Sequence, residues 1–175
     1  MIAFQIYDFV FVLFYVQKLF PLIRDEKEMT SQPVLRLGSS FPNLSVKTTK
    51  GNFNILEWKG KSWMLFFSHP ADFTPVCTTE VGALAKISED FAKRDVKLIG
   101  LSCDSVDDHN KWAKDVFAFV DTQTAGGACG MTDLPFPLIG DEDRSVAKAI
   151  GMIDASDPNS GKKSLYIRIN VLLKE

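Results

Sequence analysis

The sequence predicts an α/β fold, and three observations point to it. Two predominantly apolar runs, residues 62–68 and 96–102, have the pattern of buried central strands. A segment whose apolar residues recur at helical spacing follows each run. Because a β-α-β order pairs its two strands in parallel, we expect parallel strands at the centre of the fold.

Bulk composition limits the class of protein. With 175 residues, of which 46% are hydrophobic, the chain is about the size of one globular domain. Its 20 basic and 22 acidic residues give a formal net charge of -2 without any basic block. Because binding to nucleic acid or to an anionic membrane relies on clustered positive charge, no nucleic-acid partner is expected.

The cysteines and histidines are few and widely spaced. The three cysteines, Cys77, Cys103 and Cys129, form no C-x-x-C pair, and the only histidines are His69 and His109. This set lacks the spacing of a zinc site or of a dithiol redox motif. An odd, sparse cysteine set also argues against a secreted disulfide scaffold and for a reducing compartment, by default the cytosol.

Residues 1–29 form an apolar N-terminal extension that differs in composition from the rest of the chain. Its continuous apolar run, residues 9–16, is shorter than the roughly 20 residues that span a bilayer, and its flanks do not match a signal peptide. Three interpretations stay open: a membrane-associating segment (residues 1–23) or mitochondrial targeting segment, a packed extra helix, or residues that precede a natural start at Met29. We favour the third, which leaves residues 30–175 as the domain.

Around the first central strand, a hairpin and a helix are expected. The hairpin strands are residues 44–48 and 53–56, joined by a turn at 50–52. After the strand a helix begins near Pro75, and one face of it carries Cys77, Val81, Leu84, Ile87 and Phe91. The cysteine therefore points toward the core and is partly shielded.

The second half of the chain continues the alternation. Ser105 and Asp108 form a capping-box-like start for a helix. Residues 121–133 are rich in glycine and indicate a flexible loop. A short strand at residues 136–139, a helix with Gly151 as its C-cap and a final strand at residues 165–173 complete the domain.

The strongest chemical signal is the position of Cys77. Thr74 has the character of a helix N-cap and Pro75 that of a first helical residue, so Cys77 lies in the first turn. Backbone N–H groups there have no acceptor within the helix, which favours a thiolate. A buried cysteine is most often inert. However, Pro70, Thr74 and Cys77 cluster at the end of a core strand, where α/β sheets tend to carry sites.

The run Pro70-Ala71-Asp72-Phe73-Thr74-Pro75-Val76-Cys77 resembles the P-x-x-x-T-x-x-C loop of the peroxiredoxins. With His69 before it and Thr78-Thr79-Glu80 after it, the stretch is more similar to the one-cysteine, peroxiredoxin-6-like group of the AhpC/TSA family than to the two-cysteine group. The resemblance covers residues 37–154. It implies a thioredoxin-like fold, in which helices flank a central mixed β-sheet.

The resemblance also implies roles for individual residues. Cys77 would be the nucleophile that reduces hydrogen peroxide or an organic hydroperoxide and becomes a sulfenic acid. Pro70 would shield the thiolate from water, and the Thr74 hydroxyl would bind the peroxide oxygen. Arg168 stands where the family places an arginine that stabilises the thiolate and the breaking O–O bond. His69 is a candidate accessory residue, near the thiolate or where reductant partners bind.

Turnover would then require partners and no bound cofactor or metal. We interpret Cys103 as structural and Cys129 as part of an exposed loop without a resolving role, so an external thiol, glutathione or thioredoxin, would regenerate Cys77. A homodimer is expected. Because the family continues past the arginine strand, an alternative stays open: a truncated homologue with impaired turnover that acts as a redox sensor, a holdase or a subunit partner.

Overall fold

The computed structural model describes Leu35 and residues 38–123, 131–153 and 170–173. All of them belong to the unit Pro33–Glu175. The predicted extension, residues 1–29, lies outside the described residues, so its status stays a prediction. Among the helices of the described part, none combines the length and the apolar character that crossing a membrane requires.

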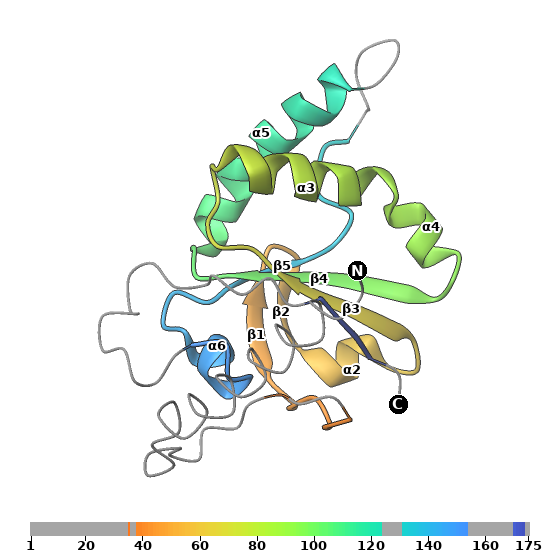
Figure 1. Ribbon diagram of the computed structural model, residues 1–175, viewed down its shortest axis with the longest axis vertical. Coiled ribbons are helices and arrows are strands. Elements are labelled where there is room, and N and C mark those ends of the chain that lie inside the picture. The colour runs from red at the N-terminus through yellow and green to blue at the C-terminus, as the bar shows by residue number, and fades with distance from the viewer. Residues whose placement is uncertain (1–34, 36–37, 124–130, 154–169, 174–175) are drawn as a thin grey trace, which may run out of the picture. The chain divides into compact units, whose positions relative to one another are not determined.

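The described strands form one mixed sheet (Figure 1). They are β1 (Ser45–Thr48), β2 (Gly51–Asn54), β3 (Trp63–Ser68), β4 (Val96–Ser102), β5 (Leu138–Gly140) and β6 (Asn170–Leu173). Their order in the sheet is β2-β1-β5-β4-β3-β6. The central strands β3, β4 and β5 are parallel, whereas β1 is antiparallel to β2 and β5, and β6 is antiparallel to β3. The predicted parallel pairing of the two central strands is confirmed.

Helices cover both faces of the sheet. They are α2 (Ile55–Lys59), α3 (Pro75–Lys86), α4 (Ser88–Ala92), α5 (Val106–Thr122) and α6 (Ser145–Ala149). Figure 1 shows α3, α4 and α5 on one side of the sheet and α2 and α6 on the other. The predicted arrangement of a mixed sheet flanked by helices is therefore confirmed.

Alternation of side chains along the central strands divides the apolar core into two parts. On β3, Met64 and Phe66 pack on the side of α2 and α6, and Leu65 and Phe67 pack on the side of α3 and α5. Gly100 of β4 adjoins Phe67, and a Cβ at this position would come within 2.8 Å of the Phe67 ring. The second of these cores contains the predicted nucleophile.

The predicted strand at residues 53–56 is wrong in its second half. β2 ends at Asn54, whose side-chain oxygen accepts hydrogen bonds from the amides of Leu56 and Glu57. An asparagine that satisfies the first free amides of a helix is a strong N-cap, so α2 begins here.

The helix after the predicted nucleophile is interrupted. α3 ends at Lys86 and α4 begins at Ser88, so Ile87 is 48% exposed and does not lie on the buried face. The Ser88 hydroxyl donates to the Ala85 carbonyl at 2.8 Å. Such a local bond competes with the backbone ladder of a helix, which explains why regular spacing in the sequence did not give one continuous helix.

The start of α5 is predicted correctly and its end is not. The Ser105 hydroxyl accepts a hydrogen bond from the Asp108 amide and caps the helix. The helix then runs to Thr122, so the loop begins later than residue 121. Residues 124–130 of that loop lie outside the described residues.

The last elements agree with the prediction apart from their ends. β5 covers Leu138–Gly140 and not residues 136–139. Gly151 follows α6 with a φ of 72°, a conformation that suits glycine after a helix. The predicted final strand is confirmed as β6 in its described part, and residues 165–169 lie outside the described residues.

Candidate active site

The segment that joins β3 to α3 is short and turns the chain sharply. β3 ends at Ser68, and Thr74 occupies the N-cap position of α3 with an extended backbone, as predicted. Between them Phe73 has a φ of 57°, a left-handed conformation that is uncommon for a bulky residue. Strain of this kind persists where the surrounding structure enforces it, and it is frequent at functional sites.

Cys77 is the third residue of α3, and only 1% of its surface is exposed. The first backbone hydrogen bond of the helix runs from the Thr78 amide to the Thr74 carbonyl. Because the Thr74 side chain makes no capping hydrogen bond, neither helix nor cap supplies an acceptor to the amides of Val76 and Cys77. Partial positive charge therefore surrounds the turn that carries the sulfur.

The structure describes the other predicted site residues to different extents. The Thr74 hydroxyl donates to the Ala71 carbonyl at 3.1 Å, which leaves its oxygen lone pairs as acceptors for another donor. Pro70, in the same loop, is exposed. Arg168 lies outside the described residues, so its approach to Cys77 stays a prediction.

Three buried polar side chains meet beside this loop. The Asp72 carboxylate contacts both histidines, since Oδ1 lies 2.6 Å from His69 Nε2 and Oδ2 lies 2.6 Å from His109 Nδ1. His109 Nε2 lies 3.0 Å from the Ile139 carbonyl oxygen. The Asp72 amide donates to the Asp104 carboxylate, which follows β4. The cluster therefore connects the loop to β4, β5 and α5.

The geometry assigns the protons of His109. A carbonyl oxygen can only accept, so Nε2 donates to Ile139, and Nδ1 donates to the ionised Asp72. Burial by itself would lower the pKa of His109, but the hydrogen bond and attraction to Asp72 outweigh it and raise the pKa above 6.5. Burial would raise the pKa of Asp72, yet the hydrogen bonds to His109 and His69 lower it below 3.8. His109 is therefore a buried imidazolium paired with a carboxylate.

These side chains offer ligand atoms close enough together for a metal ion, but their spacing favours hydrogen bonds. Zinc–ligand bonds of about 2.0–2.1 Å would hold the nitrogen and oxygen ligands roughly 3 Å or more apart. Each nitrogen–oxygen pair here is 2.6 Å apart. That separation is typical of charge-assisted hydrogen bonds, so we interpret the cluster as a hydrogen-bonded group.

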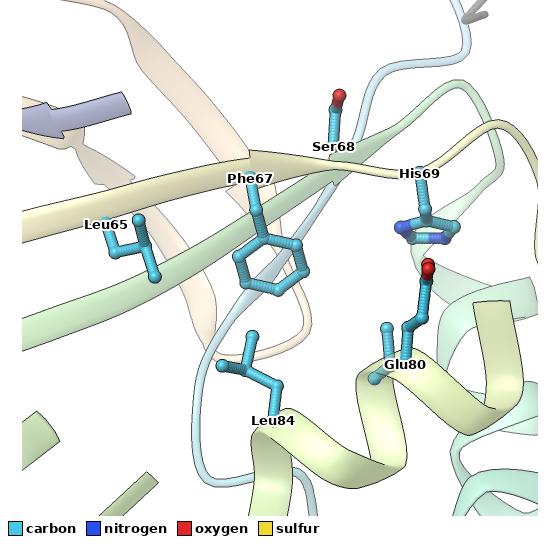
Figure 2. Close-up of a pocket in the computed structure, with 7 residues that line it drawn as sticks. Leu65, Phe67, Ser68, His69, Glu80 and Leu84 are labelled. Atoms are coloured by element: carbon cyan, nitrogen blue, oxygen red, sulfur yellow. The ribbon is translucent and has the colours of Figure 1, made fainter. Parts of the chain in front are cut away.

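His69, a member of this cluster, also lines a pocket beside α3 (Figure 2). Its ring centroid is 4.9 Å from that of Trp112, whose indole N–H donates to the Thr78 hydroxyl. Nδ1 of His69 has no hydrogen-bond partner among the described residues. Figure 2 shows Glu80 extending from α3 toward the His69 ring. The pocket measures about 310 Å³, and its remaining walls are Leu65, Phe67, Ser68, Val81 and Leu84.

Most of the chain matches one family model. The match covers residues 37–173, and the model describes the AhpC/TSA family. The chain belongs to the AhpC/TSA family. It is 49% identical over 135 residues to peroxiredoxin-6 of Rattus norvegicus, which covers 77% of this chain and 58% of the relative. It is 45% identical over 133 residues to a 1-Cys peroxiredoxin of Onchocerca volvulus, with 75% and 57% covered. The chain thus spans less than three fifths of the length of these curated relatives.

A solved structure supports the same assignment. The yeast mitochondrial 1-Cys peroxiredoxin superposes with a TM-score of 0.66 at 38% identity, covering 81% of this chain and 68% of that one. The predicted thioredoxin-like fold and the predicted resemblance to one-cysteine peroxiredoxins are therefore confirmed.

Two members of the buried cluster in this AhpC/TSA chain were given no role from the sequence. Asp72 lies inside the recognised loop, where it counted only as part of the motif. His109 lies three residues before Trp112 and seven before Val116, so it falls on the buried face of α5. A histidine on the buried face of an amphipathic helix requires hydrogen-bond partners, so this position in the sequence could have indicated that His109 belongs to a buried polar cluster.

The remaining cysteines are separate from this site in the sequence. Cys103 follows β4 and is half-buried. Burial raises the pKa of the Cys103 thiol above 9.0, although a hydrogen bond with Arg144 acts to lower it. A raised pKa leaves less of the reactive thiolate, which agrees with a structural role. Cys129 lies outside the described residues.

Proposed function

We propose that this AhpC/TSA chain is a thiol-dependent peroxidase that reduces hydrogen peroxide and organic hydroperoxides through Cys77. The observation that carries the proposal is the burial of Cys77 in the first turn of α3, where neither helix nor cap supplies an acceptor for the amides. The similarity to proteins named peroxiredoxin-6 and 1-Cys peroxiredoxin supports the same chemistry.

In the first step, the Cys77 thiolate attacks the terminal oxygen of a hydroperoxide, ROOH. An S–O bond forms, and the O–O bond breaks with its electron pair on RO⁻, which takes up a proton to give water or an alcohol. The sulfur is oxidised to a sulfenic acid while the peroxide is reduced. Charge moves across the O–O bond as it breaks. This charge is stabilised by the first-turn amides, by the Thr74 hydroxyl and, by family resemblance, by Arg168. Pro70 limits the access of water to the sulfur.

Two thiols complete the cycle. The first condenses with the sulfenic acid to give a mixed disulfide and water, and the second releases the Cys77 thiol and a disulfide of the reductant. The solved yeast 1-Cys peroxiredoxin is described as using a thiol resolving mechanism through glutathione and thioredoxin systems. We assign the same class of reductant to this chain.

Rapid mixing with hydrogen peroxide tests the proposal. Dimedone trapping at successive times, followed by peptide mass spectrometry, should locate a sulfenic acid on Cys77 that forms much faster than on free cysteine at the same pH. A Cys103→Ser variant is the matched control and should behave like the original chain. Oxidation of Cys77 no faster than that of free cysteine, or first oxidation at another cysteine, would contradict the proposal.

A homodimer and a cytosolic location are the finer parts of the proposal, and both rest on the resemblance. One similar solved structure is that of a mitochondrial protein, so the compartment needs a direct measurement. Sedimentation at several concentrations would test the dimer. Fractionation of cells that express the full chain would test the location, and recovery with mitochondria would contradict it.

A further inference from the structure

Two side-chain hydrogen bonds connect α5 to the start of α3. The indole Nε1–H of the buried Trp112 donates to the Thr78 hydroxyl at 3.0 Å. The Thr78 hydroxyl donates in turn to the Thr74 carbonyl at 2.8 Å, and the Thr78 amide donates to the same carbonyl at 3.0 Å. A chain of hydrogen bonds therefore runs from the core side of α5 to the N-cap residue of α3.

The chemistry of the three groups fixes the direction of each proton in this chain. An indole nitrogen can only donate, and a carbonyl oxygen can only accept. The Thr78 hydroxyl must then give its single proton to Thr74 and accept the proton of Trp112 with a lone pair. Because each hydrogen bond polarises the next one, the loss of either bond weakens the other.

Each of these bonds also occurs in proteins for ordinary structural reasons. A buried indole N–H usually finds an acceptor, and a threonine within a helix often donates to a carbonyl of the preceding turn. The next residue, Thr79, shows that ordinary case, since its exposed hydroxyl donates to the Val76 carbonyl at 2.8 Å. Thr78 differs because its hydroxyl also accepts a proton from another helix, and because its own acceptor belongs to the N-cap residue.

A glycine allows the two helices to approach closely enough for this chain. Gly82 lies one turn after Thr78 on α3, and α3 and α5 cover the same face of the sheet (Figure 1). A Cβ at Gly82 would come within 3.0 Å of the Phe119 side chain and 3.1 Å of the Val120 side chain. A larger residue would have to displace these side chains or separate the helices, because the interior is closely packed. The indole of Trp112 reaches Thr78 across this narrow gap.

The N-cap residue depends on Thr78 for its hydrogen bonds to the helix. Pro75, which follows Thr74, has no amide proton, and the Thr74 side chain makes no capping bond. The Thr74 carbonyl is therefore the group that binds the helix, and the two hydrogen bonds to it both come from Thr78. The placement of Thr74 relative to Cys77, three residues later, thus depends on Thr78.

We propose that Trp112 and Thr78 are positioning residues that hold the Thr74 hydroxyl where it binds the peroxide beside Cys77. The proposal rests on the peroxidase function proposed above. Because the Thr74 hydroxyl donates to the Ala71 carbonyl, its oxygen accepts the O–H of a hydroperoxide. Trp112 and Thr78 do not contact the peroxide in this scheme and act through the backbone of Thr74. A displacement of about 1 Å can cost about 10²-fold in rate, so a small shift of Thr74 has a measurable effect.

Nitrogen-15 spectroscopy of the full chain with labelled tryptophan tests the first bond without a catalytic assay. The chain has three tryptophans, and a Trp112→Phe variant assigns the indole signal of Trp112. Thr78→Val should move the proton signal of that Nε1–H upfield and speed its exchange with solvent, because the acceptor is lost. Thr79→Val, the same change one residue later, should leave the signal in place. A Trp112 signal that Thr78→Val leaves unchanged would overturn the proposal.

Two reactions of Cys77 distinguish positioning from a general loss of structure. Sulfenic acid formation with hydrogen peroxide uses the Thr74 hydroxyl, whereas alkylation by iodoacetamide requires only the thiolate. Thr78→Val should slow the peroxide reaction about tenfold and leave the alkylation rate and its pH profile unchanged. Thr78→Ser, which keeps the hydroxyl, should retain the original peroxide rate, and Thr79→Val should leave both reactions unchanged. An unchanged peroxide rate in Thr78→Val, or equal changes in the two reactions, would overturn the positioning role.

A double-mutant cycle tests the route of the effect and separates it from the proposed function. In a Thr74→Val background, Thr78→Val should not slow the peroxide reaction further, because it acts through the Thr74 hydroxyl. Fast oxidation of the original chain with equal effects of Thr78→Val in both backgrounds would overturn the positioning role alone. Oxidation of the original chain no faster than that of free cysteine would overturn the peroxidase and the positioning role with it. If Thr78→Val does not fold, Trp112→Phe takes its place in the cycle with the same expectation.

Discussion

The carboxyl ends of β3 and β4 lie next to each other in the sheet, and a helix and a cysteine follow each of them. After β4, the Ser105 hydroxyl accepts from the Asp108 amide and donates to the Asp108 carboxylate, so the start of α5 is closed. After β3, the side chain of Thr74 makes no capping bond, so the first amides of α3 stay open. A side chain thus caps the first amides of α5, whereas no side chain caps those of α3.

The cysteines differ accordingly. Cys77 lies within the open first turn, whereas Cys103 lies two residues before the cap of α5, where burial raises its pKa. A capping side chain stabilises a helix by satisfying its amides, but those amides are then no longer available to an incoming anion or oxyanion. We infer that the cap after β4 stabilises its helix. After β3, the missing cap lowers helix stability but leaves amides available to bind a reacting group.

The largest expected effect comes from exchanging the two cysteines for serine one at a time. Cys77→Ser should reduce peroxide consumption in the presence of dithiothreitol by about 10³-fold or more, because it removes the nucleophile. Cys103→Ser should leave consumption nearly unchanged. Equal losses in the two variants would show that the two strand ends are not functionally different.

Breaking the Asp72–His109 ion pair, which connects the loop after β3 to α5, should lower the free energy of unfolding by an amount that depends on pH. His109→Gln leaves a buried carboxylate without its cation, at a cost of about 3–5 kcal/mol in the free energy of unfolding. Because the pKa of His109 is raised and that of Asp72 is lowered, this contribution is full between pH 3.8 and 6.5. It should fade as the pH rises through the raised pKa, or falls through the lowered one. Urea titrations from well below pH 3.8 to well above pH 6.5 measure it, and a pH-independent cost would contradict the ion pair.

Removing the Thr74 hydroxyl should affect catalysis more than stability. Thr74→Val keeps the shape and removes the group that would bind the peroxide, so kcat/KM should fall by about 10²-fold. The melting temperature should fall only slightly, because the hydroxyl makes no capping bond and its removal loses one hydrogen bond, to the Ala71 carbonyl. A large loss of stability with unchanged kcat/KM would assign Thr74 a purely structural role.

The smallest expected effect comes from removing the capping hydroxyl at the start of α5, after β4. Ser105→Ala removes a capping hydroxyl and should lower the free energy of unfolding by about 1 kcal/mol. The rate of Cys77 oxidation should stay the same. Chemical denaturation measures the change in stability, and rapid-mixing kinetics measure the rate of Cys77 oxidation. A clear loss of rate would mean that the capped start of α5 also contributes to the chemistry.

Several features were predictable because they depend on neighbouring residues. Apolar runs gave β3 and β4, the Ser105–Asp108 pair gave the start of α5, and Thr74 with Pro75 put Cys77 in a first turn. Each of these signals lies within one element or at its end, where side-chain periodicity and free backbone amides determine the conformation.

The buried cluster was not predictable in the same way, because its parts come together only in the folded chain. Asp72 and His109 are 37 positions apart, and the Ile139 carbonyl lies 30 positions after His109. Their contact depends on the parallel arrangement of β3, β4 and β5, which brings the loop after β3 against the first turns of α5. No local pattern measures that proximity.

Local periodicity and the loop motif were sufficient to predict the family, the central β-α-β order and the position of the candidate nucleophile. The folded chain was needed to show which helix starts lack a capping side chain, where the helix after Cys77 breaks, and that Asp72 contacts both His69 and His109. These features depend on long-range contacts, because hydrogen bonding and protonation in a buried site respond to every group that the fold brings together.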